Sequence, residues 1–345
     1  MSLPNTMRAV GFQSSLPIDA PDSLTEYQLP VPTVNSGELV VRVKAVSVNP
    51  ADAKIRVRAA SSEKLPQPRI LGYDAVGQIV AIGEGVDGFA LGDQVYYAGE
   101  VTRPGSNAEY QAVDARLVAH TPKSLTEAET AVLPLTALTA WEALFDRLKV
   151  DIHARKTILV IGGAGGVGSM FIQLAKQLTN LRVIATASRK ESEAWVRQMG
   201  ADYVVNHADL VNSVRDHDFD YVDYIFNCAD TQGHWDAMAE LIAPQGMICS
   251  IVEFDGGVDL SKLQGKSAGF IWELMFTRSL YQTQDISRQQ DILFQLANLI
   301  DAGRIQSTLT ETIQGFGADQ FKQAHQMIES AATIGKIAIL YDWFD

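Results

Sequence analysis

A cluster of glycines near the middle of the chain has the spacing of a nucleotide-binding turn. The segment ILVIGGAGGVGSMFIQLAK places three glycines in a G-x-G-x-x-G pattern, between an apolar run and an amphipathic one. In such a turn the first glycine allows the tight bend, the second admits a pyrophosphate, and the third lets helix and strand pack closely. The free N–H groups of the following helix attract phosphate. We therefore predict a dinucleotide site at Gly163, Ala164, Gly165, Gly166, Val167 and Gly168.

The residues after the next predicted strand indicate which dinucleotide binds. A site for NAD has an acidic residue about 20 positions beyond the glycine turn, where it holds the ribose 2′-hydroxyl. This chain has Ser188, Arg189 and Lys190 at that place, and its next carboxylate is Glu191. A hydroxyl and two cations suit a 2′-phosphate, which arginine binds through two parallel hydrogen bonds. The pattern favours NADP(H) over NAD, with Ser188 as the N-cap of the next helix as the structural alternative.

Side chains that bind metals or form disulfides are few and widely spaced. The chain has two cysteines, Cys228 and Cys249, both in apolar strand-like runs, and its six histidines show no metal-ligand spacing. Such cysteines ordinarily serve as small buried side chains, and two are too few for a four-cysteine zinc site. We therefore expect no metal and a reducing compartment, the cytoplasm.

The composition argues against two classes of partner. The chain has 28 Lys and Arg against 41 Asp and Glu, a formal net charge of −13, whereas nucleic acid binds basic surfaces. Its apolar runs are shorter than the roughly 18 residues that span a bilayer, and the first ten residues contain no apolar signal core. We expect neither a nucleic acid partner nor a membrane partner.

Two differently built regions carry these residues. Residues 7–130 have β-branched runs broken by Gly, Pro and Asp turns, which is typical of a small barrel. From about residue 126, where Thr126 and Glu129 have capping-box spacing, strands and helices alternate, which indicates a parallel sheet covered on both faces. The tail is expected to return to the first region. The predicted α/β fold has a discontinuous domain, residues 1–129 and 280–345, and a doubly wound Rossmann domain, residues 130–279.

Further segments resemble one superfamily over nearly the whole chain. They are VSVNPADAKIR (46–56), ILGYDAVGQIVAIGEGV (70–86), LGDQVYY (91–97), NAEYQAV (107–113), LPLTALTAWEAL (133–144) and GKIAIL (335–340). With the glycine turn they resemble the medium-chain dehydrogenase/reductase superfamily. The likeness is greatest to its zinc-free NADPH:quinone oxidoreductases of the zeta-crystallin type, often labelled zinc-type alcohol dehydrogenase-like. The resemblance implies a GroES-like barrel domain, an active site between the two domains, and a homodimer joined through edge strands.

The chain departs from the zinc members of that superfamily at each metal position. The stretch NPADAK has no cysteine, and Gly72-Tyr73-Asp74 stands where those enzymes have Gly-His-Glu. Their later catalytic cysteine and their four-cysteine lobe have no counterpart. Because a catalytic zinc needs about three protein ligands, this comparison implies a metal-free site. Substrates must then hold the negative charge themselves after hydride transfer, as quinones and α,β-unsaturated carbonyls do.

The resemblance also implies roles for single residues. Asn49 and Asp52 match a segment beside the nicotinamide, and Tyr73 occupies the position of the missing zinc histidine. Lys54 lies on the same side as Asp52 if the segment is extended. These four are the candidate catalytic residues, with structural alternatives: a turn at Asn49, packing for Tyr73, and an ion pair between Asp52 and Lys54. Further cofactor contacts implied by position are Thr136, Thr139, Tyr203, Asn227, Cys228, Ile251, Val252, Phe276, Arg278 and Lys336.

The sequence as a whole predicts a cytoplasmic, NADPH-dependent, zinc-independent reductase of quinones. One alternative on the same scaffold is a reductase of enones or enals. Another is a non-catalytic NADPH-binding protein, because some relatives of this branch serve as crystallins. A zinc alcohol dehydrogenase is the least favoured. The expected partners are a small quinone or unsaturated carbonyl and a second copy of the chain.

Overall fold

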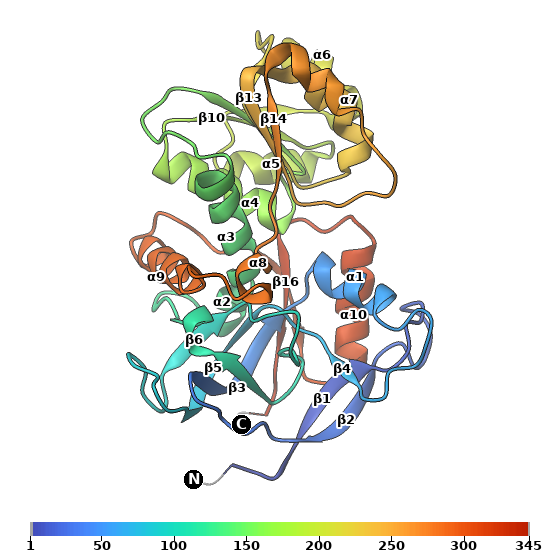
Figure 1. Ribbon diagram of the computed structural model, residues 1–345, viewed down its shortest axis with the longest axis vertical. Helices are drawn as coiled ribbons and strands as arrows, with labels where there is room; N and C mark the ends of the chain where they lie inside the picture. The colour runs from blue at the N-terminus through green and yellow to red at the C-terminus, as the bar shows by residue number, and fades with distance from the viewer. Residues whose placement is uncertain (1–2, 344–345) are drawn as a thin grey trace. The chain divides into compact units, whose positions relative to one another are not determined.

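The computed structural model describes residues 3–343 of the 345-residue chain (Figure 1). Residues 1, 2, 344 and 345, at the ends of the predicted barrel domain, lie outside the described residues. The chain forms two compact units, of which the first combines residues 1–135 with 276–345 and the second is residues 136–275. In the described part of the chain, every helix is too short or too polar to cross a membrane.

The first unit contains two β-sheets. Its strands are β1 (Thr6–Phe12), β2 (Thr25–Pro30), β3 (Glu38–Ser47), β4 (Arg69–Ile70), β5 (Ala75–Ile82), β6 (Gln94–Tyr97), β7 (Tyr110–Asp114), β8 (Ala119–His120), β15 (Leu309–Gln314) and β16 (Lys336–Leu340). One sheet has the order β2–β1–β4, and the other has the order β15–β16–β3–β5–β6–β8, with β7 also paired to β3. Because β16 pairs antiparallel with β3, the tail of the chain completes a sheet begun near its start.

The helix of residues 50–58 in the first unit was not predicted in the sequence analysis. The unit contains α1 (Pro50–Arg58), η1 (Ala115–Leu117), α2 (Glu127–Ala131), α8 (Thr277–Leu280), α9 (Arg288–Asp301) and α10 (Ala318–Glu329). Helix α1 forms because Pro50 takes the first helical position and the Asp52 carboxylate accepts a hydrogen bond from the Asn49 N–H (2.9 Å). The capping box of Thr126 and Glu129, which starts α2, confirms the prediction made from their spacing.

The second unit is the predicted doubly wound parallel sheet. Its strands are β9 (Thr157–Ile161), β10 (Arg182–Thr186), β11 (Tyr203–Val205), β12 (Val222–Asn227), β13 (Ile242–Ser250) and β14 (Gly269–Trp272). The order is β11–β10–β9–β12–β13–β14, and all neighbours are parallel. The direction of winding reverses between β9 and β12. Ligands of open α/β sheets bind at the carboxyl ends of the strands at such a reversal.

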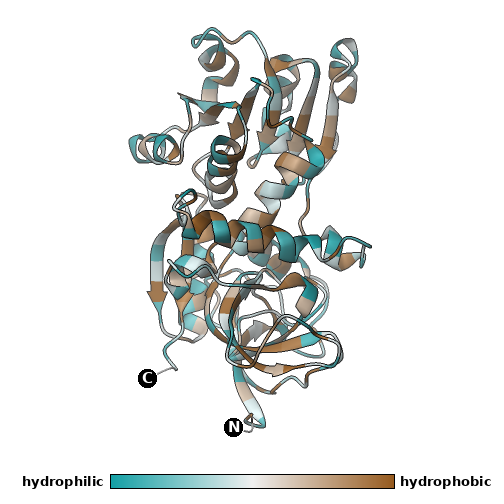
Figure 2. Cartoon of the chain, turned by 90° about the vertical axis from the view of Figure 1, so that its left-hand side faces the viewer, coloured by the Kyte–Doolittle hydropathy of each residue, from teal (hydrophilic) through white to brown (hydrophobic). Residues whose placement is uncertain are grey.

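Helices cover this sheet and close its core. They are α3 (Pro134–Trp141), which enters from the first unit, the π-helical η2 (Glu142–Arg147), α4 (Gly166–Leu178), α5 (Lys190–Gln198), η3 (His207–Asp209), α6 (Leu210–Arg215), α7 (Thr231–Leu241) and η4 (Leu260–Lys266). Leu159 and Ile225 of the sheet pack in one buried cluster with Trp235 and Met238 of α7. Figure 2 shows hydrophobic residues concentrated on the strands, with hydrophilic residues on the outer turns. The sequence analysis did not predict η3 and α6, and α7 begins at Thr231 because Asp230 caps it.

Candidate functional site

The glycine turn joins β9 to α4 and leaves almost no space for a side chain at Gly163 or Gly168. A Cβ atom on Gly168 would lie 2.3 Å from the Gly162 carbonyl oxygen, and one on Gly163 would lie 2.9 Å from the Cβ of Ala185. The left-handed residue of the turn is Gly162, with a φ of +81°. Gly163 lies inside this turn, which the Gly165 N–H closes by donating to the Gly162 carbonyl oxygen (3.3 Å), and its missing side chain lets the turn pack against β10.

The start of α4 is open toward a ligand. Gly165 is the N-cap and has no side chain to satisfy the first N–H groups of a 13-residue helix. A Cβ added to it would meet nothing closer than 3.6 Å, and residues 164–167 are partly exposed. Unsatisfied N–H groups at a helix start attract anions, so the turn fits the pyrophosphate of a dinucleotide.

The end of β10 carries a hydroxyl and two cations. Ser188, Arg189 and Lys190 are exposed, and α5 begins at Lys190. The alternative that Ser188 caps this helix is wrong by one residue, because Arg189 holds the N-cap position and its N–H donates to the Ser192 hydroxyl (3.1 Å). Residues 187–190 contain no carboxylate. The hydroxyl and the two cationic groups can donate hydrogen bonds to a 2′-phosphate.

His207, which the sequence analysis did not single out, begins η3 two residues after β11. Thr186 pairs with Val205 in the parallel register of β10 and β11, and Ser188 and His207 each follow two residues after the end of their strand. Tyr203, predicted to lie near the adenosine phosphate, is at the start of β11 and packs on Phe219, with ring centroids 5.0 Å apart. The position of His207 follows from the register of β10 and β11, which a single sequence does not contain.

The carboxyl ends of β12 and β13 are held together by side chains. Asn227 is buried, and its amide donates to the hydroxyls of Thr231 and Ser250, both at 3.0 Å. Cys228 is half-buried, beside Gly162, and burial raises the pKa of its thiol. Ile251 and Val252 follow β13 and are half-buried, and the other predicted residues of this unit, Thr136 and Thr139, are buried on α3.

The barrel unit brings several predicted residues into one buried polar cluster, which we call the Lys336 cluster: Asn49, Asp52, Asp74 and Lys336. The Lys336 ammonium donates to Asn49 Oδ1 (2.5 Å), Asp74 Oδ2 (3.2 Å) and the Val48 carbonyl (3.2 Å). The Asn49 amide donates to Asp74 Oδ2 (2.8 Å). Both ends of the Asn49 side chain are therefore committed inside the protein, and Lys336 is 3% exposed.

The two carboxylates of the Lys336 cluster organise the backbone. Asp52 accepts hydrogen bonds from the N–H groups of Asn49 (2.9 Å) and Gly72 (3.0 Å), and Asp74 accepts from that of Leu135 (2.7 Å). Burial raises the pKa of Asp74 to about 6, against the opposing effect of Lys336. The condition that would place Lys54 beside Asp52 fails, because α1 is helical and residues two apart on a helix do not face each other.

Tyr73 differs from the other three candidate catalytic residues. Its side chain is fully buried, and its hydroxyl has no hydrogen-bond partner. Burial, with the nearby charge of Asp52, raises the pKa of Tyr73 to about 12; the Arg69 guanidinium opposes this without reaching hydrogen-bond geometry. The group is thus a protonated, unused donor near neutral pH. A buried polar atom without a partner is rare and calls for an explanation, such as a ligand or a water molecule.

Phe276 and Arg278, two of the predicted cofactor contacts, are buried in the first unit. Phe276 is buried with its ring edge-on to Tyr73, at a centroid distance of 5.2 Å. Arg278 is also buried and forms an ion pair with Asp285, with 3.0 Å between nitrogen and oxygen.

The donor set at the position of the missing zinc ligands does not fit zinc. Within residues 3–343, no three His, Cys, Asp or Glu side chains gather as metal ligands would. Asp74 is committed to Asn49, Lys336 and the Leu135 N–H, which leaves Tyr73 as the polar group at that place. The side chains at this position therefore do not form a zinc ligand set.

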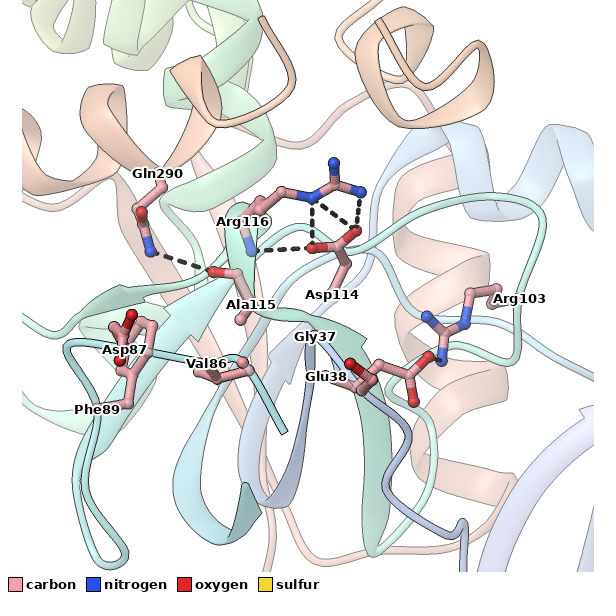
Figure 3. Close-up of a pocket in the computed structure, with 12 residues that line it drawn as sticks. Gly37, Glu38, Val86, Asp87, Phe89, Arg103, Asp114, Ala115, Arg116 and Gln290 are labelled. Atoms are coloured by element: carbon pink, nitrogen blue, oxygen red, sulfur yellow. Dashed lines mark hydrogen bonds and ion pairs between the residues drawn. The ribbon is translucent and has the colours of Figure 1, made fainter. Parts of the chain in front are cut away.

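A separate cavity of about 330 Å³ in the barrel unit contains none of the predicted site residues (Figure 3). Its two arginines are already neutralised, Arg103 by Glu38 at 2.8 Å and Arg116 by a bidentate contact with Asp114. Because both arginines are paired with carboxylates, neither provides an unpaired positive charge for an anionic cofactor in this cavity.

Comparison with known proteins adds four findings. Residues 35–123 match the alcohol dehydrogenase GroES-like domain family, and residues 199–339 match the zinc-binding dehydrogenase family. The chain is 40% identical over 338 residues to a zinc-type alcohol dehydrogenase-like protein of Staphylococcus epidermidis, covering 96% of this chain and 99% of that one. A Rhizobium etli protein assigned to the zinc-dependent alcohol dehydrogenases has a crystal structure that matches with a TM-score of 0.93 and 41% identity, covering 98% of each chain. The 2-methylene-furan-3-one reductase of Solanum lycopersicum is 35% identical over 215 residues, 60% of this chain and 54% of that protein.

Proposed function

We propose, from the premise that this chain belongs to the medium-chain dehydrogenase/reductase superfamily, that it is an NADPH-dependent, zinc-independent reductase of conjugated carbonyl compounds, with quinones as the first candidate. The observation that carries the proposal is the Tyr73 hydroxyl, a buried donor without a partner where zinc relatives have a metal ligand. A quinone or an enone holds the charge left by hydride transfer on its own oxygen, and one aligned donor can stabilise that oxygen.

The cofactor part of the proposal rests on the second unit. The Gly163–Gly168 turn and the start of α4 would hold the pyrophosphate, and Ser188, Arg189 and Lys190 would hold the 2′-phosphate. The nicotinamide supplies the hydride when it is bound. The protein's own residues then bind, orient and exclude water around the reacting groups.

The barrel unit would supply the acidic group. The raised pKa of Tyr73 keeps its hydroxyl protonated near neutral pH, so that it can donate to the substrate oxygen. Asn49, Asp52 and Lys336 act as positioning residues, because the Lys336 cluster fixes the start of α1 and the Gly72 backbone next to Tyr73.

Enones and enals are the second candidate substrates, and one comparison favours them. The tomato relative is named for the reduction of a conjugated furanone, and it shares 35% identity with this chain over the matched region. A reductase of that kind would use the same donor and cofactor, since hydride addition to the β-carbon gives an enolate.

A two-panel assay tests the substrate class. NADPH oxidation is followed with a set of quinones and with a set of unsaturated ketones and aldehydes, and each measurement is repeated with NADH. Turnover of quinones with NADPH supports the first candidate, and turnover confined to enones supports the second. NADPH binding without turnover on either panel would overturn the proposed activity and favour a non-catalytic protein.

A tyrosine pair tests the role of Tyr73. Tyr73→Phe is expected to lower kcat about 10²- to 10³-fold, the effect of losing one donor to a developing oxyanion, with little change in the affinity for NADPH. Tyr97→Phe is the matched control, because Tyr97 is also buried in the barrel unit with an unpaired hydroxyl. Equal kcat values for wild type and Tyr73→Phe would remove Tyr73 from the mechanism.

The proposal also includes a homodimer and a cytoplasmic location. Strand β14 is the last strand of the six-stranded sheet, and an edge of this kind can pair with a second copy of the chain. Both cysteines are free thiols, which fits a reducing compartment.

A further inference from the structure

A positively charged side chain lies close to the unpaired hydroxyl of Tyr73. Arg69, in β4, is half-buried, and its Nη2 atom donates a hydrogen bond to the Val101 carbonyl (2.8 Å). Burial and the Asp52 charge raise the pKa of Tyr73, and the Arg69 guanidinium is near enough to oppose them. The Tyr73 hydroxyl nevertheless has no hydrogen-bond partner among the described residues. Because a guanidinium and a protonated hydroxyl both donate, an acceptor atom between them can bond to both.

One tightly packed stretch of backbone carries both donors. Three backbone hydrogen bonds of 2.9–3.1 Å join residues 70–72 to residues 105–107. Gly72 has a φ of +115°, and a Cβ atom added to it would lie 2.4 Å from the Ser106 hydroxyl oxygen. The Tyr73 ring packs edge-on against Phe276, at a centroid distance of 5.2 Å. Donors that are fixed in advance stabilise a developing charge without the cost of reorganising around it.

The charge of Arg69 is not neutralised by a carboxylate. In the part of the chain that the structure describes, no Asp or Glu side chain pairs with this guanidinium, and its one hydrogen bond leaves further N–H groups to donate. Arg103, in the same unit, is instead paired with Glu38 at 2.8 Å and with Glu100 at 3.3 Å. A half-buried arginine with unused donors beside an unpaired hydroxyl suits an anionic oxygen.

We propose that Arg69 and Tyr73 both donate hydrogen bonds to one substrate oxygen, the atom that becomes negatively charged when hydride is added, so that the protein binds an enolate or a hydroquinone anion more tightly than the neutral carbonyl compound. The inference rests on the proposed reduction of conjugated carbonyls. It adds a second catalytic residue to that site, and it predicts that the protein binds stable phenolates.

Binding of a stable anion tests this site without turnover. The probe is para-nitrophenol, which is titrated into the protein saturated with NADP⁺, and the visible absorbance of its phenolate form reports the ionised fraction of the bound ligand. The wild type is expected to bind the phenolate. Arg69→Met should raise the Kd of the phenolate about 10- to 100-fold, the effect of losing one hydrogen bond to a charged group. The affinity for NADP⁺ should not change.

Two further variants separate charge from folding. Arg69→Lys keeps the charge but not the planar set of donors, so it should recover part of the phenolate affinity. Arg103→Met is the matched control, because it removes an arginine of the same unit that is already paired, and it should bind phenolate as the wild type does. Thermal denaturation and NADP⁺ titration check that each variant is folded.

Turnover gives a second measurement of the same site. Arg69→Met should lower kcat, and combining it with Tyr73→Phe should cost less than the product of the two single losses, because both donors act on one oxygen. A wild type that does not bind phenolate, or an equal phenolate Kd for wild type and Arg69→Met, overturns the inference while leaving the reductase activity to stand. Turnover of neither substrate panel by the wild type would instead overturn the proposed function.

Discussion

Individual polar atoms separate the four candidate catalytic residues into two kinds. Asn49 and Asp52 use their side chains to hold Lys336 and the backbone, and Lys54 is half-buried on helix α1, whereas the Tyr73 hydroxyl is buried with no partner. Residue types alone do not reveal this division, because asparagine, aspartate and tyrosine can all donate or accept near a reacting group. What matters is which hydrogen bonds the fold has already formed.

The Lys336 cluster predicts a large cost for removing its only ammonium. Lys336→Met leaves the buried Asp74 carboxylate without its cation, and breaking a buried pair in this way lowers the free energy of unfolding by about 3–5 kcal/mol. Chemical denaturation monitored by fluorescence measures the loss. Lys64→Met, at an exposed position, is the control and should change it by less than about 0.5 kcal/mol. A similar small loss for Lys336→Met would show that Asp74 is neutral in the folded protein.

At the scale of elements, the sequence predicted those that carry strong local signals. The glycine turn and the alternation of strands and helices predicted the parallel sheet, and the Thr126 capping box predicted the start of α2, whereas helices α1 and α6 were missed. Helix α1 has little hydrophobic periodicity and is fixed mainly by Pro50 and by Asp52, which reaches the distant Gly72 N–H. The position of His207 likewise depends on strand register, which a single sequence does not contain.

The contact between the glycine turn and α4 predicts the effect of a single methyl group. Gly168→Ala places a Cβ 2.3 Å from the Gly162 carbonyl oxygen, so the turn must shift. We expect a loss of about 1–3 kcal/mol in the free energy of unfolding and weaker NADPH binding, because the N–H groups at the start of α4 move with the turn. Thermal denaturation and NADPH titration measure the two effects.

Gly257→Ala is the matched control, because nothing lies within 4 Å of an added Cβ and its φ is not left-handed. It should leave both stability and NADPH binding nearly unchanged. If Gly168→Ala binds NADPH as tightly as wild type does, the turn is not part of the cofactor site.

For the molecule as a whole, the unpaired edge of β14 in the second unit is the proposed site of pairing with a second copy of the chain. Strand β14 pairs with β13, and the exposed side chains Trp272 (45%) and Leu274 (52%) lie at its carboxyl end. Trp272 also packs against the rings of Phe254 and Phe270, at centroid distances of 5.8 and 4.9 Å. Large exposed apolar side chains beside an unpaired strand edge are typical of an interface.

The proposed dimer can be tested at this edge. Light scattering should give a mass near twice the 37.6 kDa of one chain for the wild type. Trp272→Glu combined with Leu274→Glu should shift the population toward the mass of one chain, because two like charges would meet across the two-fold axis. Leu91→Glu, in an exposed loop of the first unit, should remain dimeric. A wild-type mass of one chain would contradict the dimer.

The pairing of β16 with β3 has a consequence for the order of folding during synthesis. Lys336 and Val48, which are hydrogen-bonded in the folded protein, lie 288 residues apart in the sequence. At common rates of translation, about 5–20 residues per second, the ribosome takes roughly 15–60 s between them. Residues 136–275 form a continuous unit that can fold in this interval, whereas residues 45–47 of β3 lack their β16 partner until the end of the chain is made. The nascent chain therefore passes through a stage in which all residues of the second unit have been made and one end of β3 has an unpaired edge, a feature that favours aggregation.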